Sequence, residues 1–455
     1  MTGTVLLTNG EQRSALAIAR ALHARGLDVL ALASSTKSYA ASSRAFREVV
    51  LAPRADADPR GFLDAVLQVA RRRGIELIVP ISDEDLIVLD AGRSTLGGVP
   101  LAMASSNSLR LVLDKRANLD LAELNGVPLP REFHLRDRSQ IPEMIAALGW
   151  PIVMKRPGSP LDPQVPQFRF RVELLHDRAQ LESAIAKHCP QPPFPLFQEY
   201  VGGEAFNLVC MAVHGEIVAI HQYQSLRTHQ GCGVLRRTVQ PDELLEHHCR
   251  TLLRALDWNG VAHVGFFCDP RTGRTGYMEV NGRFWGSTQT SVDAGWDFPW
   301  WVWRYFTRGE RPDVPELRVG SETVWRYGDV QALVAYLRGG PSPTPGTEPG
   351  ARRAALEFLH SYLGPARSET FRWSDPGPGL RDARHAAFDL WRLIARSVGA
   401  PRAPRQVLEA ADSARTAVQQ VRVASSATAG TDHALHPLHG QEWTRRPDRY
   451  ALVWP

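Results

Sequence analysis

Short apolar runs alternate with amphipathic stretches over the first hundred residues of the chain. The apolar runs lie at residues 5–10, 28–33 and 76–81, and helical repeats that end at a glycine lie at residues 14–25 and 61–73. Buried parallel strands read as continuous apolar runs, and glycine is typical just after the last helical residue. The alternation predicts a parallel α/β domain.

Strands and turns dominate the middle of the chain, and helical repeats dominate its end. We expect a helix at 107–125, a strand ending at 155, strands on both sides of the glycine pair 202–203, and further strands up to 227. Beyond them we expect a helix at 243–256, a hairpin joining 261–268 to 277–283, and helices at 297–306, near 330 and 355, and at 383–397. The helix at 297–306 carries three tryptophans, which is typical of a core or a partner interface and less often of a pocket. Residues beyond 400 have little apolar clustering, so a partly disordered tail is expected.

Composition excludes several classes of protein. The chain has 455 residues, 44% of them apolar and 22% charged, which is typical of a soluble protein of several domains. No apolar run approaches the ~18 residues that cross a bilayer, and the first residues lack the pattern of a signal peptide. Five scattered cysteines without a C-x-x-C pair indicate reduced thiols in the cytoplasm. The net charge of +5 is spread along the chain, which disfavours nucleic acid as a partner.

The choice of cation is more informative than the net charge. Only four of the 53 lysine and arginine residues are lysines, at positions 37, 115, 155 and 187. Nearly all basic residues of this chain are arginines, so we expect a lysine to remain where a compact ammonium on a flexible stem is needed. Lys115 and Lys155 therefore become candidates for phosphate contact, with an ordinary exposed helix lysine as the alternative for Lys115.

Residues 277–287, YMEVNGRFWGS, carry the most distinctive polar pattern in the chain. Glu279, Asn281 and Arg283 alternate with other residues, so in a strand their side chains would project from one face. Carboxylate and amide oxygens suit Mg²⁺, which takes its remaining ligands from phosphate and water, and arginine binds phosphate oxygens in a fork. The pattern favours a magnesium–phosphate site, with a solvated edge strand as the alternative.

This stretch resembles the metal-binding strand of the ATP-grasp ligases, usually written E-x-N-x-R, whose second x is often proline and is Gly282 here. Four more pieces follow the family's order: an α/β domain at the start, the pair Asp114-Lys115, a V-x-K strand ending at Lys155, and an E-Y-V hinge at 199–201. The resemblance covers residues 1–330.

The resemblance implies a fold and a division into domains. A parallel α/β (pre-ATP-grasp) domain would be followed by an ATP-grasp fold of two α+β subdomains and a helical C-terminal extension. The implied ranges are 1–105 for the first domain, 106–195 for the N-terminal subdomain with its phosphate lid, 196–330 for the C-terminal subdomain with the metal site, 331–400 for the helical extension and 401–455 for a tail rich in Ala, Arg and Pro.

It also implies a nucleotide site. Lys115 and Lys155 would contact the phosphates, and Glu279 and Asn281 would hold Mg²⁺. The adenine would bond the backbone of the hinge at Glu199, Tyr200 and Val201, and Glu204 would take the ribose hydroxyls. A buried strand with a glycine turn is an equal alternative for the hinge.

Two further segments would contact the reacting groups. Arg283, and Arg227 in the basic loop at 225–238, would stabilise the transferring phosphoryl group, while Arg236 and Arg237 would hold the substrate carboxylate. A solvated surface hairpin is an equal alternative for this loop.

Two segments depart from the family. The lid at 158–171 contains one glycine and three internal prolines, so we expect a stiffer lid than backbone contact with phosphates usually requires. The second metal-binding acid is expected at position 265, which is glycine, and His263 on the same face is a poor substitute because imidazole is softer than Mg²⁺ prefers. One metal suffices, another acid such as Asp269 reaches in, or catalysis is lost.

The expected function is that of an ATP-dependent ligase that joins a small carboxylic acid, an amino acid or peptide-like, to an amine through an acyl phosphate, releasing ADP and phosphate. ATP and Mg²⁺ are the implied cofactors, and a homodimer is compatible with the sequence. The alternative is a nucleotide-binding protein of the same fold without ligase activity, which Gly265 favours.

Overall fold

A computed structural model of the chain describes residues 3–155, 172–202, 204–269, 272–340 and 350–397. The chain divides into two compact units, residues 1–393 and 394–455. The lid predicted at 158–171 and the tail predicted at 401–455 lie outside the described residues. The domain boundaries inside the first unit stay a prediction.

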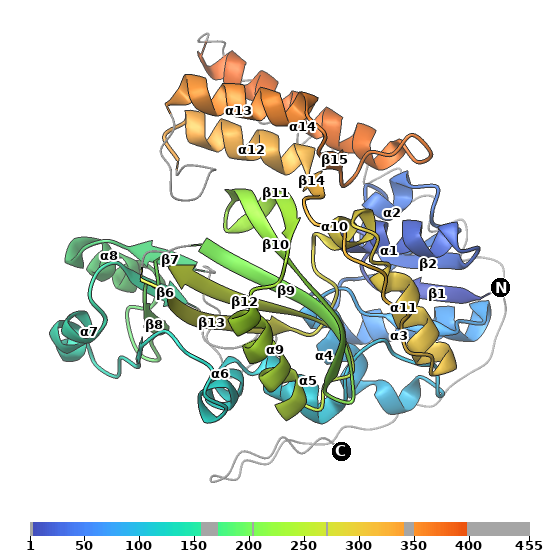
Figure 1. The fold of residues 1–455 in the computed structure, drawn as a ribbon, viewed down its shortest axis with the longest axis horizontal. Coiled ribbons are helices and arrows are strands. Elements are labelled where there is room, and N and C mark those ends of the chain that lie inside the picture. Colours follow the sequence, from blue (N-terminus) through green and yellow to red (C-terminus); the bar gives the residue numbers. More distant parts are fainter. Residues whose placement is uncertain (1–2, 156–171, 203, 270–271, 341–349, 398–455) are drawn as a thin grey trace, which may run out of the picture. The chain divides into compact units, whose positions relative to one another are not determined.

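The first sheet is parallel, with the strand order β3–β2–β1–β4. Figure 1 labels its two central strands, β1 and β2. Its elements are β1 (Thr4–Leu7), α1 (Arg13–Ala24), β2 (Asp28–Ala33), α2 (Tyr39–Ser42), β3 (Glu48–Leu51), α3 (Pro59–Arg73), β4 (Leu77–Val79), α4 (Asp83–Ala91) and the 3₁₀ turn η1 (Arg93–Thr95). The predicted parallel α/β domain is confirmed. Helix α4 escaped prediction because its apolar residues are consecutive, and it begins at a capping box made by Ser82 and Asp85.

The helix predicted at 107–125 is two helices, α5 (Ser106–Leu113) and α6 (Lys115–Leu124). Asp114 adopts an extended backbone between them, and its carboxylate accepts hydrogen bonds from the backbone N–H groups of Arg116 and Ala117. An aspartate that caps a helix in this way stabilises a helix start, so the prediction of one continuous helix was wrong. The break places Lys115 in the first turn of α6.

A second sheet has the order β5–β8–β6–β7, and its pairs are antiparallel. It contains β5 (Glu132–Phe133), β6 (Ile152–Lys155), β7 (Val172–Leu175) and β8 (Leu196–Glu199), with η2 (Arg138–Gln140), α7 (Ile141–Leu148) and α8 (Arg178–His188) beside it. These helices pack on one face of the sheet around Met144, Ile152, Leu181 and Phe197.

The third sheet has the order β13–β12–β9–β10–β11–β14–β15. Its elements are β9 (Glu204–Val213), β10 (Glu216–His229), β11 (Cys232–Val239), α9 (Glu243–Ala255), β12 (Gly260–Asp269), β13 (Arg274–Asn281), α10 (Thr288–Asp293), α11 (Phe298–Arg308), β14 (Glu322–Val324) and β15 (Arg367–Ser368). Helices α12 (Arg326–Leu337), α13 (Ala351–Leu363) and α14 (Gly377–Ser397) follow, as the predicted helical extension requires. Within the described residues, no helix has the length and apolar character needed to cross a membrane.

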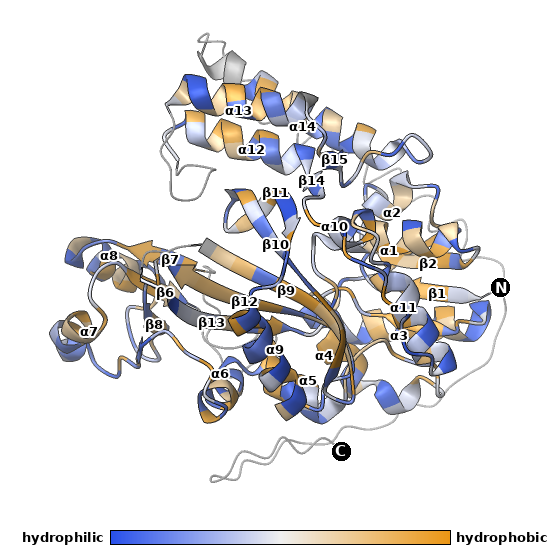
Figure 2. Ribbon diagram, viewed as in Figure 1, coloured by the Kyte–Doolittle hydropathy of each residue, from blue (hydrophilic) through white to orange (hydrophobic). Residues whose placement is uncertain are grey.

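The first and third sheets share their hydrophobic cores. Along β1, Leu6 enters one core and its neighbours Val5 and Leu7 enter another, and along β9 Leu208 and Val209 divide between the same two cores. Alternate strand residues point to opposite faces, so each core runs across both sheets. Figure 2 shows the hydrophobic residues concentrated along these strands.

The tryptophan-rich helix belongs to the core. Trp300, Trp301 and Trp303 of α11 are all buried and pack in the same core as Val5 and Val209. The interpretation of this helix as core is confirmed.

Candidate nucleotide and metal site

The hairpin of β12 and β13 sets the geometry of the site. Gly265 is the direct partner of Glu279, and His263 is the direct partner of Asn281. A register shift after Gly265 leaves Met278 without a direct partner on β12. Glu279 and Asn281 lie on one face of β13, where the Asn281 amide donates to Glu279 Oε1 at 3.0 Å. The predicted convergence of this carboxylate and this amide is confirmed.

Gly282, where the family often has proline, is fixed by packing. A Cβ at this position would lie 2.5 Å from the ring of the buried Trp258. Glycine is therefore needed for the close approach of this ring to the strand end.

Arg283 continues the polar face beyond the end of β13. Its guanidinium donates to Asp83 at 2.8 and 3.2 Å and lies 3.4 Å from Asn281 Oδ1. Asp83 is the first residue of α4, so this ion pair links the end of β13 to a helix of the first α/β domain. No local pattern predicts this role of Asp83, because Arg283 is 200 residues away along the chain.

Both predicted lysines lie close enough to act on Glu279. Burial lowers the pKa of Lys155, and the charge of Lys115 lowers it further while Glu279 opposes the shift. Partial loss of hydration raises the pKa of Glu279, but the Asn281 amide and the charges of Lys115, His263 and Arg283 outweigh it, and the pKa lies below its ordinary value. Two ammonium groups and an ionised carboxylate therefore gather at one place.

No family model matches the chain. Over 202 residues it is 27% identical to an N5-carboxyaminoimidazole ribonucleotide synthase of Synechococcus elongatus, an alignment that covers 43% of this chain and 47% of the synthase. The chain thus matches about half the length of this curated relative.

Similarity to solved structures covers more of the chain than similarity in sequence does. N5-carboxyaminoimidazole synthetase from Staphylococcus aureus superposes with a TM-score of 0.57 at 13% identity, covering 80% of this chain and 98% of that one. The biotin carboxylase β-γ-ATP complex from Campylobacter jejuni gives 0.56 at 13%, covering 70% and 74%, and L-amino acid ligase from Bacillus licheniformis gives 0.53 at 16%, covering 67% and 74%. The chain has the ATP-grasp fold. The resemblance predicted from its motifs is confirmed at the level of the fold.

The segment predicted to be the nucleotide hinge, residues 199–201, begins at the end of β8. Glu199 is buried, and its carboxylate is paired with Arg131 at 2.7 Å and Arg274 at 2.6 Å. Val201 is buried and Tyr200 is exposed, while the side chain of Glu204 lies outside the described residues. The two arginines occupy the Glu199 carboxylate, and the role of this segment in binding the adenine through its backbone stays a prediction.

The basic loop predicted at 225–238 is a hairpin of β10 and β11 whose register shifts on both sides of Arg227, and its arginines are already paired. Arg227 is buried and donates to both oxygens of Asp329 at 2.7 and 2.6 Å. Arg237 pairs with Glu322 at 2.6 Å on the surface. These contacts hold both guanidinium groups on acids other than Glu279. We therefore do not propose the expected catalytic role of Arg227 or the expected substrate role of Arg237.

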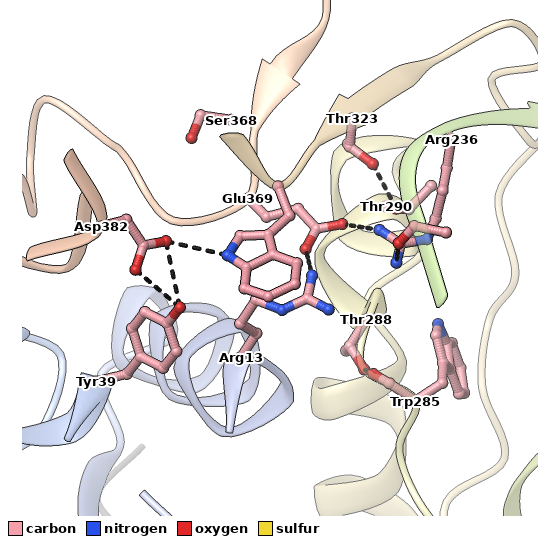
Figure 3. A network of polar contacts seen from close by, with 12 residues as sticks. Arg13, Tyr39, Arg236, Trp285, Thr288, Thr290, Thr323, Ser368, Glu369 and Asp382 are labelled. Carbon is pink, nitrogen blue, oxygen red and sulfur yellow. Dashed lines mark hydrogen bonds and ion pairs between the residues drawn. The ribbon is translucent and has the colours of Figure 1, made fainter. Parts of the chain in front are cut away.

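Arg236 lies closer to the cluster but has an internal partner. Figure 3 shows Glu369, which follows β15, between Arg236 and Arg13, and it is paired with both. Arg236 is also close enough to His263 for its charge to lower the pKa of that imidazole. A carboxylate of the C-terminal extension thus occupies the arginine that was expected to hold the substrate carboxylate.

His263 contacts Asn281 and two polar residues of β9 and β10. Its Nε2 lies 2.9 Å from Asn207 Oδ1 and 3.4 Å from the Tyr223 hydroxyl, and its Nδ1 lies 3.3 Å from the Asn281 amide nitrogen. Burial lowers the pKa of His263 to about 4. The ring is therefore neutral at pH 7, with a proton on Nε2 that it donates to Asn207. Asn207 is the partner of Gly265 on β9, a neighbour that only the strand register reveals.

The donor set fits a hard divalent cation held partly by phosphate. Glu279 and Asn281 offer two oxygens, and Mg²⁺ typically takes few protein ligands and several from phosphate and water. Among the described residues, no group of three or more His, Cys, Asp and Glu side chains is arranged for a metal ion, so the second donor here is an amide.

Proposed function

We propose that the protein is an ATP-dependent ligase that joins a carboxylic acid to an amine. The observation that carries the proposal is the shared face of Glu279 and Asn281 on β13 of an ATP-grasp fold, within electrostatic reach of the charges of Lys115 and Lys155. Two ammonium groups beside a carboxylate that can hold a cation would match the charges of a metal-bound triphosphate.

The reaction divides into two balanced steps. A substrate carboxylate oxygen attacks the γ-phosphorus of ATP, and the bond to the β-phosphate oxygen breaks to release ADP and form an acyl phosphate. The amine nitrogen then attacks the acyl carbon, phosphate leaves, and the amine loses a proton as the amide forms. The protein contributes position and charge neutralisation rather than covalent chemistry.

Each residue of the cluster has a part in these steps. Lys115 and Lys155 neutralise the phosphates, and Glu279 and Asn281 would hold Mg²⁺, which supplies charge neutralisation at the transferring phosphoryl group. Arg283 is held by Asp83 beside Asn281 and can stabilise the developing acyl phosphate. The hinge at Glu199, Tyr200 and Val201 would bind the base, and Glu204 the ribose.

The substrates belong to a class rather than to one compound. We propose a small carboxylic acid, amino acid or peptide-like, and an amine nucleophile, because the named relatives are a carboxyaminoimidazole ribonucleotide synthase and an L-amino acid ligase. A homodimer is compatible with this proposal. Free thiols at all five cysteines support the cytoplasm as the compartment.

A nucleotide-binding protein without ligase activity is the second candidate. It is favoured by Gly265, which lies directly opposite Glu279 where the family is expected to place a second acid. Such a protein would bind nucleotide with little dependence on a divalent cation and would not release ADP.

Release of ADP and phosphate separates the two candidates. The purified full-length protein is mixed with ATP, Mg²⁺ and a panel of amino acids and small acids, each with and without an amine. The ligase predicts ADP release that requires both an acid and an amine and disappears in Glu279→Gln. Nucleotide binding without ADP release for any pair supports the second candidate.

A further inference from the structure

Three side chains that could each ligate a metal ion, from two neighbouring strands, lie close together in the hairpin of β12 and β13. The amide nitrogen of Asn281 lies 3.0 Å from Glu279 Oε1 and 3.3 Å from His263 Nδ1. The amide therefore sits between a carboxylate oxygen and an imidazole nitrogen, two groups that both accept hydrogen bonds. An amide N–H₂ satisfies them in the arrangement that the structure describes.

Rotation of the Asn281 amide by half a turn converts this cluster into a set of ligands. The rotation gives up the 3.4 Å hydrogen bond that Asn281 Oδ1 accepts from Arg283, whose guanidinium keeps its ion pair with Asp83. The amide oxygen would replace the nitrogen, and three acceptors would then converge without a proton between them. A divalent cation satisfies such a group, because it attracts all three lone pairs at once. The separations also suit one, because neighbouring ligands around an octahedral ion with bonds of roughly 2.1 Å lie about 3 Å apart.

The imidazole is held as a ligating histidine usually is. Its Nε2 donates to Asn207 Oδ1 at 2.9 Å, which fixes the tautomer and leaves the Nδ1 lone pair facing the Asn281 amide. The ring also stacks parallel to Tyr223 at a centroid distance of 6.4 Å, with 3° between the planes. A second hydrogen bond of this kind commonly orients a metal-bound imidazole.

We infer that His263 Nδ1, Glu279 and Asn281 together bind a divalent cation of intermediate softness such as Mn²⁺ in preference to Mg²⁺. An imidazole nitrogen raises the affinity for Mn²⁺ and later first-row ions, whereas Mg²⁺ prefers oxygen throughout. In this way His263 compensates for Gly265, which offers no second carboxylate opposite Glu279. The inference rests on the proposed function only for the use of the ion, because binding is measured without turnover.

Nitrogen ligation is tested directly on the unaltered protein. The full-length chain, with its histidines labelled with ¹⁵N, is loaded with Mn²⁺ without nucleotide and examined by electron spin-echo envelope modulation. We expect a ¹⁵N coupling that becomes a ¹⁴N coupling in unlabelled protein. Absence of any histidine nitrogen coupling overturns the inference. Mn²⁺ is the probe because Zn²⁺ would also bind the exposed thiol of Cys232.

Variants then assign the coupling to one residue. His263→Gln places an amide where Nε2 was, so it can keep the contact with Asn207 while removing Nδ1. We expect this variant to lose the nitrogen coupling and to bind Mn²⁺ about tenfold more weakly, while its Mg²⁺ affinity changes by less than about twofold. The control is His247→Gln on the exposed side of α9, which should change neither.

The outcomes distinguish this inference from the proposed function. A coupling that persists in a folded His263→Gln protein, or equal losses of Mn²⁺ and Mg²⁺ affinity, would overturn the role of His263 whether or not the protein is a ligase. Conversely, Mn²⁺ ligated by His263 without ADP release would leave the inference intact and reject the ligase.

Discussion

Gly265 and Glu279 are direct partners across the hairpin of β12 and β13. A Cβ built on Gly265 would meet Met278 at 3.4 and 3.5 Å, which is ordinary van der Waals contact, and the backbone there is not in the left-handed region. The strand can therefore accept a side chain at the position where the second acid of the site was expected.

Gly265→Asp is predicted to strengthen Mg²⁺ binding. A second carboxylate beside Glu279 adds an attractive charge near the ion, and we expect the affinity for Mg²⁺ in the presence of an ATP analogue to rise about tenfold, which is about 1.4 kcal/mol. Isothermal titration calorimetry measures the change. Gly265→Asn is the matched control because it has the same shape without the charge. Equal affinities in the two variants would show that position 265 does not face the ion.

Lys155→Arg is predicted to weaken ATP binding although it keeps the positive charge. Burial already lowers the pKa of Lys155, and the wider guanidinium has to fit where a compact ammonium lies. We expect a loss of affinity for the ATP analogue of at least about tenfold. Lys187→Arg, at an exposed position in the last turn of α8, is the control. Unchanged affinity in Lys155→Arg would place this residue outside the phosphate site.

Arg227→Gln is predicted to reduce stability rather than nucleotide affinity. The substitution leaves Asp329 as a buried, unpaired carboxylate, which costs about 3–5 kcal/mol of the free energy of unfolding. Urea denaturation measures that loss. The exposed pair of Arg237 and Glu322 provides the comparison, since Arg237→Gln should cost less than about 1 kcal/mol. A stable Arg227→Gln protein with impaired turnover would instead support the catalytic role expected from the sequence.

His221 is predicted to make the protein less stable in acid. This histidine is buried beside Ser291, Trp296 and Phe298, and burial lowers its pKa to about 4. The unfolded chain, with a pKa near 6.5, binds the proton more readily. The stabilisation is therefore complete above about pH 6.5 and is lost as the pH falls toward 4, by about 3 kcal/mol in total.

Comparison of variants isolates this contribution. Burial raises the pKa of Asp85 to about 6, so this group adds stability as the pH falls and opposes the effect of His221. The contribution of His221 is therefore the difference in the pH dependence of stability between the wild type and His221→Gln. Urea denaturation between pH 7 and 4 should show a shallower loss in His221→Gln, and His247→Gln should follow the wild type. Parallel curves for the wild type and His221→Gln would contradict the assignment.

The parts of the fold that could be predicted from the sequence are those that depend on local pattern. The alternation of apolar runs and helical repeats indicated the parallel sheet, and the alternation of Glu279 and Asn281 indicated a shared face. The break at Asp114 was missed because the apolar spacing continues across it, and only the capping contacts of its side chain reveal two helices.

Contacts between distant segments could not be predicted. Asp83 holds Arg283, Asp329 holds Arg227 and Glu369 holds Arg236, each across more than one hundred residues. An arginine-rich hairpin looks the same in sequence whether its charges face a substrate or internal acids. The role of His263 depended on Asn207, which lies on a strand fifty-six residues away and becomes a neighbour only through the register of β9 and β12.

The most direct test of the account is calorimetric titration of the full-length protein and of Glu279→Gln with a non-hydrolysable ATP analogue, each with and without Mg²⁺ or Mn²⁺. The account predicts that the wild type binds the analogue more tightly when the cation is present and that Glu279→Gln loses this dependence. Binding that ignores the cation in the wild type, or no binding at all, would contradict a metal–nucleotide site at Glu279 and Asn281.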